Sequence, residues 1–167
     1  VSEAGVRQFA VHTRMAILGR RVSTEQNRSI PPLVHETAHR LSRDMPECEF
    51  FINGGLKSLA ECAQHIDRPD SRLAGAMVGR AAWTSPLALL AKADTTIFGA
   101  SSDPCTTPRD LVERYADYAD RRFEICDDPT DNMTLLRPLH YIFTGVTGNR
   151  QFRTCLVAAA SRDLKTV

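Results

Sequence analysis

Residues 48–55 read Cys48-Glu49-Phe50-Phe51-Ile52-Asn53-Gly54-Gly55, a short apolar run that ends in a pair of glycines. An apolar run of this length, closed by glycines, is typical of a buried β-strand followed by a turn. Ser58 comes shortly afterwards, and serine often begins a helix because its side chain accepts a hydrogen bond from a free backbone amide. The stretch therefore predicts a strand, a glycine turn, and a helix that runs through Leu59 and Ile66.

Two further segments show the same pattern of apolar run and polar or glycine ending. They are Arg7-Gln8-Phe9-Ala10-Val11, ending at His12, and Gly75-Ala76-Met77-Val78, ending at Gly79-Arg80. We expect one helix from Pro31-Pro32 to Arg43 and another from Ala81 to Ala93. Strands that alternate with helices predict a parallel α/β sheet. With 167 residues, the chain is too short for a complete eight-stranded α/β barrel, which takes about 250 residues.

The pattern changes beyond Gly99. Residues 100–108 are rich in Ser, Pro and Thr and are expected to form a linker. Helical spacing of apolar residues follows over 109–126, then over 133–144 with a kink at Pro138, and again after Gly148. We therefore predict an α/β domain over 1–99, a linker over 100–108 and a small all-α domain over 109–167.

Composition limits the possible functions only weakly. The net charge is +1, but nearly all of the 21 basic residues are arginine, which either suits RNA contact or reflects a GC-rich genome. Five scattered cysteines form no metal-binding or disulfide pattern and indicate reduced thiols. Neither a membrane-spanning stretch nor a signal peptide is evident, so we expect a cytoplasmic or organellar-matrix protein that is not secreted and has no membrane partner.

The ends of the predicted strands are suited to binding a phosphate. Glycines such as Gly54 and Gly55 let the backbone approach an anion, and the amides of a following helix point towards it. Gly79 and Arg80 would add a second glycine and a guanidinium at the next strand end. His12, at the end of the preceding strand, is either a core histidine or a ligand contact on the same rim.

The segment His35-Glu36-Thr37-Ala38-His39 matches the HExxH pattern of zinc peptidases. No third ligand is evident, and the segment lies on an expected outer helix. We therefore predict an amphipathic surface helix whose histidines flank the apolar stripe, and no metal site. A zinc peptidase remains a remote alternative.

Taken in order, several short motifs resemble the tRNA-dihydrouridine synthase family, in particular the bacterial A-type branch. They are His12-Thr13-Arg14, Gln26-Asn27-Arg28-Ser29-Ile30-Pro31-Pro32-Leu33, Ile52-Asn53-Gly54-Gly55-Leu56-Lys57-Ser58-Leu59, Met77-Val78-Gly79-Arg80-Ala81-Ala82, Ile97-Phe98-Gly99 and Tyr141-Ile142-Phe143-Thr144-Gly145-Val146-Thr147-Gly148-Asn149-Arg150-Gln151-Phe152-Arg153. The resemblance covers nearly the whole chain. It implies the C-terminal part of a TIM-type barrel, about three βα units, followed by a helical tRNA-binding domain.

The resemblance also implies a function: an FMN-dependent oxidoreductase that reduces uridine in tRNA to 5,6-dihydrouridine, with NADPH as reductant. By position, six residues would bind the flavin and three would contact tRNA. The FMN residues are His12, Asn53, Gly54, Gly55, Gly79 and Arg80, and the tRNA residues are Arg28, Arg150 and Arg153. Departures from the family pattern, such as Phe152 and Pro138, concern the tRNA contacts more than the flavin cradle.

In the family, a cysteine protonates the uracil ring, and it lies upstream of the point where this chain begins. None of the five cysteines here matches it, so we nominate no catalytic residue. We expect a piece of a longer protein that needs its missing barrel half or a partner. The alternatives are a non-catalytic RNA-binding or structural relative, or another phosphate-binding barrel flavoenzyme.

Overall fold

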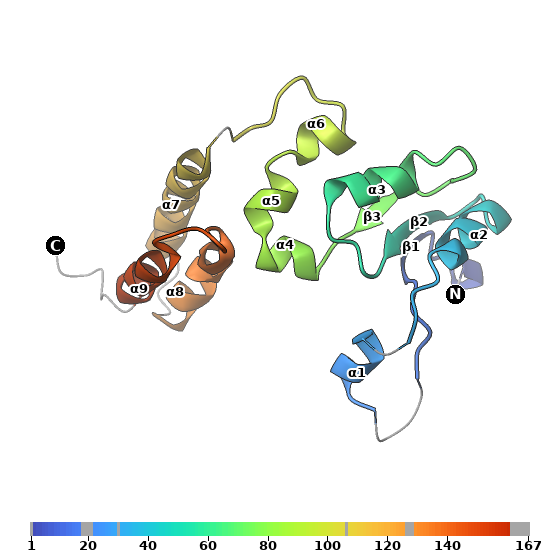
Figure 1. Ribbon diagram of the computed structural model, residues 1–167, viewed down its shortest axis with the longest axis horizontal. Helices are drawn as coiled ribbons and strands as arrows, with labels where there is room; N and C mark the ends of the chain where they lie inside the picture. Colours follow the sequence, from blue (N-terminus) through green and yellow to red (C-terminus); the bar gives the residue numbers. More distant parts are fainter. Residues whose placement is uncertain (1, 18–21, 30, 106, 126–128, 161–167) are drawn as a thin grey trace. The chain divides into compact units, whose positions relative to one another are not determined.

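The computed structural model describes residues 2–17, 22–29, 31–105, 107–125 and 129–160 (Figure 1). Contacts within the chain divide it into two compact units, Val1–Gly79 and Arg80–Val167. We call them the sheet unit and the helical unit and describe each by itself.

The sheet unit is built on three parallel strands, β1 (Gln8–His12), β2 (Glu49–Asn53) and β3 (Gly75–Met77), arranged in that order. His12 lies opposite Asn53, and Asn53 lies opposite Met77. The carboxyl ends of all three strands therefore meet at one edge, which we call the carboxyl edge. The predicted parallel α/β arrangement is confirmed, with strand ends within one residue of those expected.

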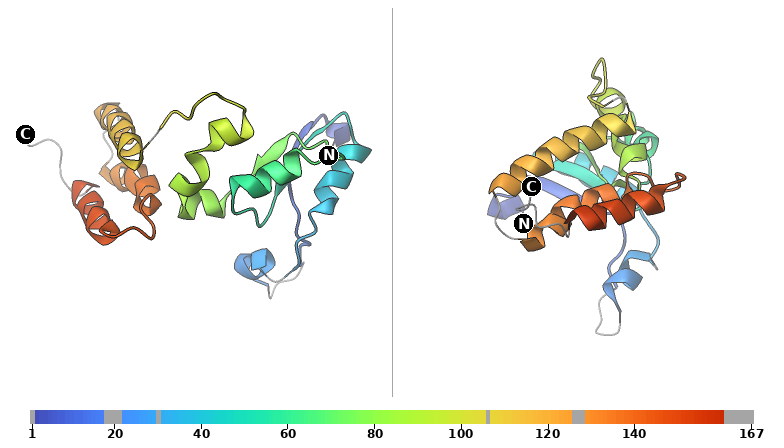
Figure 2. Two further views of the ribbon diagram at one scale, coloured as in Figure 1. Left: turned by 45° about the horizontal axis from the view of Figure 1, so that its top comes forward. Right: turned by 90° about the vertical axis from the view of Figure 1, so that its left-hand side faces the viewer.

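Among the described residues of this unit, four helices accompany the strands. They are the 3₁₀ helix η1 (Ser2–Ala4) and the α-helices α1 (Thr24–Ser29), α2 (Glu36–Asp44) and α3 (Leu59–Ile66). Helix α2 packs on β2 and α3 packs on β3. Helix α1 lies on the connection between β1 and α2, away from the sheet in both Figures 1 and 2.

The core of the sheet unit lies on one face of β2. Phe50 and Ile52 are buried there, whereas Phe51 on the other face is only half-buried. Alternation of this kind follows from the two-residue period of a strand. Burying Phe50 and Ile52 stabilises the fold by about 2–3 kcal/mol per side chain.

Helix α2 begins at Glu36, later than the expected start at Pro31-Pro32. The residues just before it pair with the segment that follows β1. Val34 N donates to the carbonyl of Thr13 over 2.7 Å, and Leu33 forms an antiparallel bridge with Arg14. The prolines thus precede the helix, because the backbone at Leu33 and Val34 bonds to the segment that follows β1.

The helical unit begins with three short helices, α4 (Arg80–Thr84), α5 (Pro86–Leu90) and α6 (Ala93–Ile97). The single helix predicted over 81–93 is therefore wrong. Pro86 explains the first break, because a proline ring lacks the amide that would continue a helix and is favoured at a helix start. Trp83 and Tyr141 pack with their ring centroids 5.8 Å apart.

The remainder comprises α7 (Pro108–Ile125), α8 (Pro129–Leu136), the 3₁₀ helix η2 (Arg137–Tyr141) and α9 (Asn149–Ala160). These elements lie together in both Figures 1 and 2. Their core consists of Ala119, Leu136, Leu139, Ile142 and Leu156. Pro138 lies in the first turn of η2, so the helix expected over 133–144 changes there from α to 3₁₀ geometry.

The contact-based division after Gly79 does not coincide with the linker expected over 100–108. The functional domain limits, 1–99 and 109–167, stay predictions. Within the residues that the structure describes, no helix is both long and apolar enough to cross a membrane.

Candidate functional site

The turn after β2 is formed by two glycines in the left-handed region, Gly54 at φ 120° and Gly55 at φ 74°. A Cβ atom on Gly54 would lie 3.0 Å from Leu33 Cδ2 and 3.1 Å from both His12 Nδ1 and Thr13 Oγ1. A Cβ on Gly55 would lie 2.3 Å from Leu33 Cδ1. Both backbone strain and close packing therefore require glycine here.

His12 and Asn53 flank this turn at the carboxyl edge. His12 is exposed, and Asn53 is half-buried. The Asn53 carbonyl accepts two hydrogen bonds from the buried Thr13, one from its amide at 2.8 Å and one from its hydroxyl at 3.1 Å. The structure thus brings His12, Asn53, Gly54 and Gly55 together. Thr13 stabilises this arrangement through its two hydrogen bonds to the Asn53 carbonyl.

The start of α3, just beyond the turn, is capped from within the chain. Ser58 Oγ accepts from the amide of Glu61 over 3.2 Å, as predicted for this serine. Glu61 Oε2 in turn accepts from the amide of Lys57 over 2.7 Å. Two of the amides near this helix start are therefore satisfied internally.

Gly79 and Arg80 follow β3 and are both exposed. A Cβ on Gly79 would meet no atom within 4 Å, and its backbone is outside the left-handed region. Arg80 is the first residue of α4 and so belongs to the helical unit.

The histidines of the HExxH segment are not arranged as expected for an exposed helix face. His39 is fully buried, with Nδ1 3.1 Å from Ser71 Oγ and Nε2 3.0 Å from His65 Nδ1. His35 is half-buried, and its Nε2 lies 2.9 Å from the Gly54 carbonyl oxygen. The prediction of histidines flanking a surface helix is therefore wrong, because α3 and the loop that contains Ser71 pack over α2.

The arrangement of His35, Glu36 and His39 does not resemble a zinc centre. The described residues include no group of three side chains placed to hold a metal ion. Glu36, the glutamate of the pattern, bridges Arg43 and Arg68 at 2.7 Å each. Hydrogen bonds from these two arginines lower the pKa of Glu36 to about 2, which makes it a poor general base.

Burial also shifts the pKa of two histidines and one thiol of the sheet unit. It is the main cause of the lowered pKa of His39 and of His65. The pKa of Cys62, which is buried in α3, is raised by the same effect. Of the other cysteines, Cys48 is buried and precedes β2, Cys105 and Cys155 belong to the helical unit, and Cys126 lies outside the described residues.

A second candidate site is a cavity of about 740 Å³ in the helical unit. Its lining comes from η2 and α9 and consists of His140, Asn149, Arg150, Arg153, Thr154, Val157 and Ala158. Two buried polar atoms in this lining, His140 Nε2 and Asn149 Oδ1, have no hydrogen-bond partner in the described part of the chain. Arg150 and Arg153 are exposed on the first turns of α9. The cavity therefore offers positive charge beside unsatisfied polar groups.

Sequence reasoning found the two arginines but missed His140 and Asn149. Their significance depends on burial, which no local pattern reveals. Arg28, the third arginine expected to contact tRNA, lies in α1, and its side chain is outside the described part of the structure.

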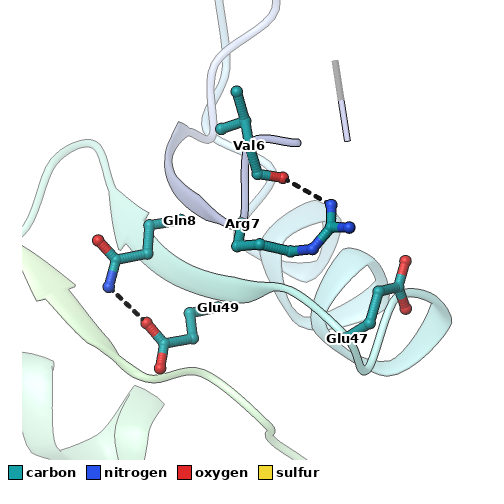
Figure 3. Close-up of a pocket in the computed structure, with 5 residues that line it drawn as sticks. All are labelled: Val6, Arg7, Gln8, Glu47 and Glu49. Carbon is teal, nitrogen blue, oxygen red and sulfur yellow. Dashed lines mark hydrogen bonds between the residues drawn. The ribbon is translucent and has the colours of Figure 1, made fainter. Parts of the chain in front are cut away.

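Another hollow, of about 650 Å³, lies at the opposite end of the sheet, where β1 and β2 begin. Figure 3 shows its lining, with Gln8 donating to Glu49 over 2.7 Å and Arg7 turned towards the carbonyl of Val6. Glu47 and Glu49 contribute negative charge here, which disfavours a phosphate. We therefore place no anion site at this end.

Fold and site together define a parallel α/β protein with a glycine turn at its carboxyl edge and a helical unit with a basic cavity. The family model described as dihydrouridine synthase matches residues 1–163. The chain belongs to the dihydrouridine synthase family, and the resemblance inferred from the sequence is confirmed.

Individual relatives agree with this assignment. The chain is 36% identical over 156 residues to a tRNA-dihydrouridine(20/20a) synthase of Pseudomonas aeruginosa, covering 93% of this chain and 44% of that protein. It is 37% identical over 148 residues to the protein of the same name from Escherichia coli K12, covering 89% and 40%. The chain thus spans less than half the length of these curated relatives.

Proposed function

We propose that this chain is the C-terminal part of an FMN- and NADPH-dependent tRNA-dihydrouridine synthase. The observation that carries the proposal is the meeting of His12, Asn53, Gly54 and Gly55 at the carboxyl edge of a parallel sheet, in a chain of this family. In α/β barrels this edge is where substrates and phosphate groups bind. The upstream half of the barrel would supply the catalytic cysteine and pair with the strand edges of this unit.

The residues of the carboxyl edge would bind the ribityl phosphate of FMN. The glycine turn would present backbone amides, His12 would contact the flavin or its phosphate, and Gly79 would leave space for the anion. Arg80 would supply a charge-assisted hydrogen bond to a phosphate oxygen. Reduced flavin would provide the hydride for reduction of the uracil ring.

The helical unit would bind tRNA. Arg150 and Arg153 stand three residues apart at the start of α9, on one face of the helix, as contact with successive backbone phosphates requires. The unsatisfied atoms of His140 and Asn149 in the adjoining cavity are suited to hydrogen bonds with a nucleotide. Arg28 would add a further contact.

Flavin binding is the direct test. The purified chain is titrated into FMN, and quenching of flavin fluorescence is followed for the wild type, Gly54→Asp and Arg80→Ala. We expect both substitutions to weaken binding by tenfold or more, because one adds negative charge and strain to the turn and the other removes a charged hydrogen bond.

Two control variants separate a lost contact from general damage. Gly5→Asp introduces the same residue at another left-handed glycine, φ 92° with no atom within 4 Å of its Cβ position. Arg40→Ala removes an exposed arginine from α2. Both should keep wild-type affinity. A chain that is folded by circular dichroism but has no affinity for FMN would contradict the proposed cradle.

A further inference from the structure

Three histidines of the sheet unit connect the glycine turn to the packing of α2 against α3. His35 Nε2 lies 2.9 Å from the Gly54 carbonyl oxygen, and the His35 ring meets the His65 ring edge-on at 4.7 Å. His65 Nδ1 lies 3.0 Å from His39 Nε2, and His39 Nδ1 lies 3.1 Å from Ser71 Oγ. We call His35, His39 and His65 the histidine cluster.

The Gly54 carbonyl, at one end of these contacts, determines which nitrogen of His35 carries the proton. A carbonyl oxygen only accepts, so His35 Nε2 carries the hydrogen and donates it to Gly54. Between His39 and His65, one nitrogen donates and the other accepts, and the hydroxyl of Ser71 completes the arrangement in either direction. All the contacts are therefore satisfied when the three rings are neutral.

We propose that His35 is a positioning residue that sets the orientation of the Gly54–Gly55 peptide, with His65 and His39 supporting its ring. This inference rests on the proposed role of the turn as a phosphate cradle. In a planar trans peptide, the carbonyl and the following amide point in opposite directions. Holding the Gly54 carbonyl on His35 therefore directs the Gly55 amide away from α2.

The turn needs such an anchor because of its composition. Glycine has the widest choice of backbone conformations, so two consecutive glycines do not maintain one orientation by themselves. Gly54 is buried, and a buried carbonyl that loses its donor is costly. A preorganised amide also binds an anion more tightly than one that must first be ordered.

The surroundings of His39 and His65 favour the neutral form of both rings. Burial lowers the pKa of both His39 and His65, and for His65 the proximity of His35 and His39 lowers it further. The charged groups facing these rings are Glu36, Arg43, Glu61, Arg68 and Asp70. The cluster is thus suited to hold His35 by ring contact and neutral hydrogen bonds.

The test compares three variants of the chain by FMN fluorescence quenching. His35→Ala removes the donor, whereas His35→Gln places an amide donor close to the former position of Nε2. We expect His35→Ala to weaken binding about tenfold, because the Gly55 amide would then have to be ordered when the anion binds. His35→Gln should recover most of this affinity, which a purely structural role would not predict. Arg40→Ala on the same helix is the control.

A second measurement separates this inference from the proposed function. In ¹H–¹⁵N spectra the Gly55 amide resonance should shift in His35→Ala and return towards its wild-type position in His35→Gln. Wild-type FMN binding with unchanged affinity in His35→Ala would overturn the positioning role alone. If the wild type binds no FMN, the proposed cradle fails, and an unmoved Gly55 resonance would then overturn the positioning role as well. If His35→Ala does not fold, His35→Gln with a displaced Gly55 resonance would overturn it.

Discussion

Gly54 and Gly79 both follow a strand of the sheet, but the fold constrains them differently. Gly54 is held at φ 120° against Leu33, His12 and Thr13, so internal packing alone explains its lack of a side chain. Gly79 has open space around it and no left-handed backbone. Because the described fold gives no steric reason for a glycine at position 79, this residue is the cleaner probe of a bound anion.

Substitutions at Gly79 should act through charge and not through folding. We expect Gly79→Asp to weaken FMN binding about tenfold, because a carboxylate would repel the phosphate, and Gly79→Ala to weaken it less, because a methyl group only takes up space beside the anion. Both variants should have wild-type thermal melting temperatures, measured by circular dichroism. Equal affinities of the two variants would argue against a phosphate beside Gly79.

At the scale of single elements, α3 depends on a short-range cap. Ser58→Ala removes the oxygen that accepts from the Glu61 amide and should lower the free energy of unfolding by about 1 kcal/mol. Ser58→Thr keeps the oxygen and should retain most of that stability. Urea denaturation followed by circular dichroism measures the difference. Ser101→Ala, in an exposed loop, is the control, and an effect of the same size there would contradict the cap.

The packing of α2 against α3 should respond to pH through the histidine cluster. Burial lowers the pKa of His39 and His65 below the usual 6.5. Below about pH 6.5 the unfolded chain therefore binds protons that the folded chain does not, and stability falls as the pH falls. Above that pH the two states bind equal numbers of protons at these sites, and the effect is absent.

Melting temperatures measured from pH 7.5 to pH 5 would test this dependence. We expect the wild type to lose stability below pH 6.5 and His65→Gln to lose less over the same range, since one titrating ring is removed. Arg40→Ala, which removes an exposed arginine from α2, serves as the control and should follow the wild-type profile. Parallel profiles for wild type and His65→Gln would show that the cluster does not titrate on unfolding.

At the scale of the whole molecule, the proposed function assigns cofactor binding to the sheet unit and tRNA binding to the helical unit. The sheet unit presents the glycine turn, and the helical unit presents a basic cavity with two unsatisfied polar atoms. The glycine turn belongs to the sheet unit, and the basic cavity belongs to the helical unit. Effects on tRNA binding and on FMN binding should therefore be separable by mutation.

Loss of phosphate contacts should appear in the salt dependence of tRNA binding. Arg150→Ala and Arg153→Ala should each weaken tRNA binding and reduce the slope of log affinity against log salt by about one. Filter binding or fluorescence anisotropy at several salt concentrations measures this slope. Arg121→Ala, exposed on α7 of the same unit, should leave it unchanged. Weaker binding with an unaltered slope would indicate that these arginines do not contact phosphates.

The amino-acid sequence by itself was sufficient for features that depend on neighbouring residues. The apolar runs predicted the three parallel strands, Ser58 predicted a helix start, and the ordered motifs identified the family. The alternation of apolar and polar residues, helix capping and turn preferences each depend on only a few neighbouring residues. They can therefore be predicted without a structure. The meeting of His12 with the glycine turn also followed, because parallel strands end at a common edge.

Only the tertiary structure decided which polar side chains meet across elements. The pattern His35-Glu36-Thr37-Ala38-His39 suggested a zinc site or a surface helix. In the structure, His39 is instead buried against His65 and Ser71, and His35 is hydrogen-bonded to the Gly54 carbonyl. Likewise, His140 and Asn149 become unsatisfied only once η2 and α9 enclose them. Burial and partner choice are set by residues far apart in sequence, and the physical properties of these histidines follow from that packing.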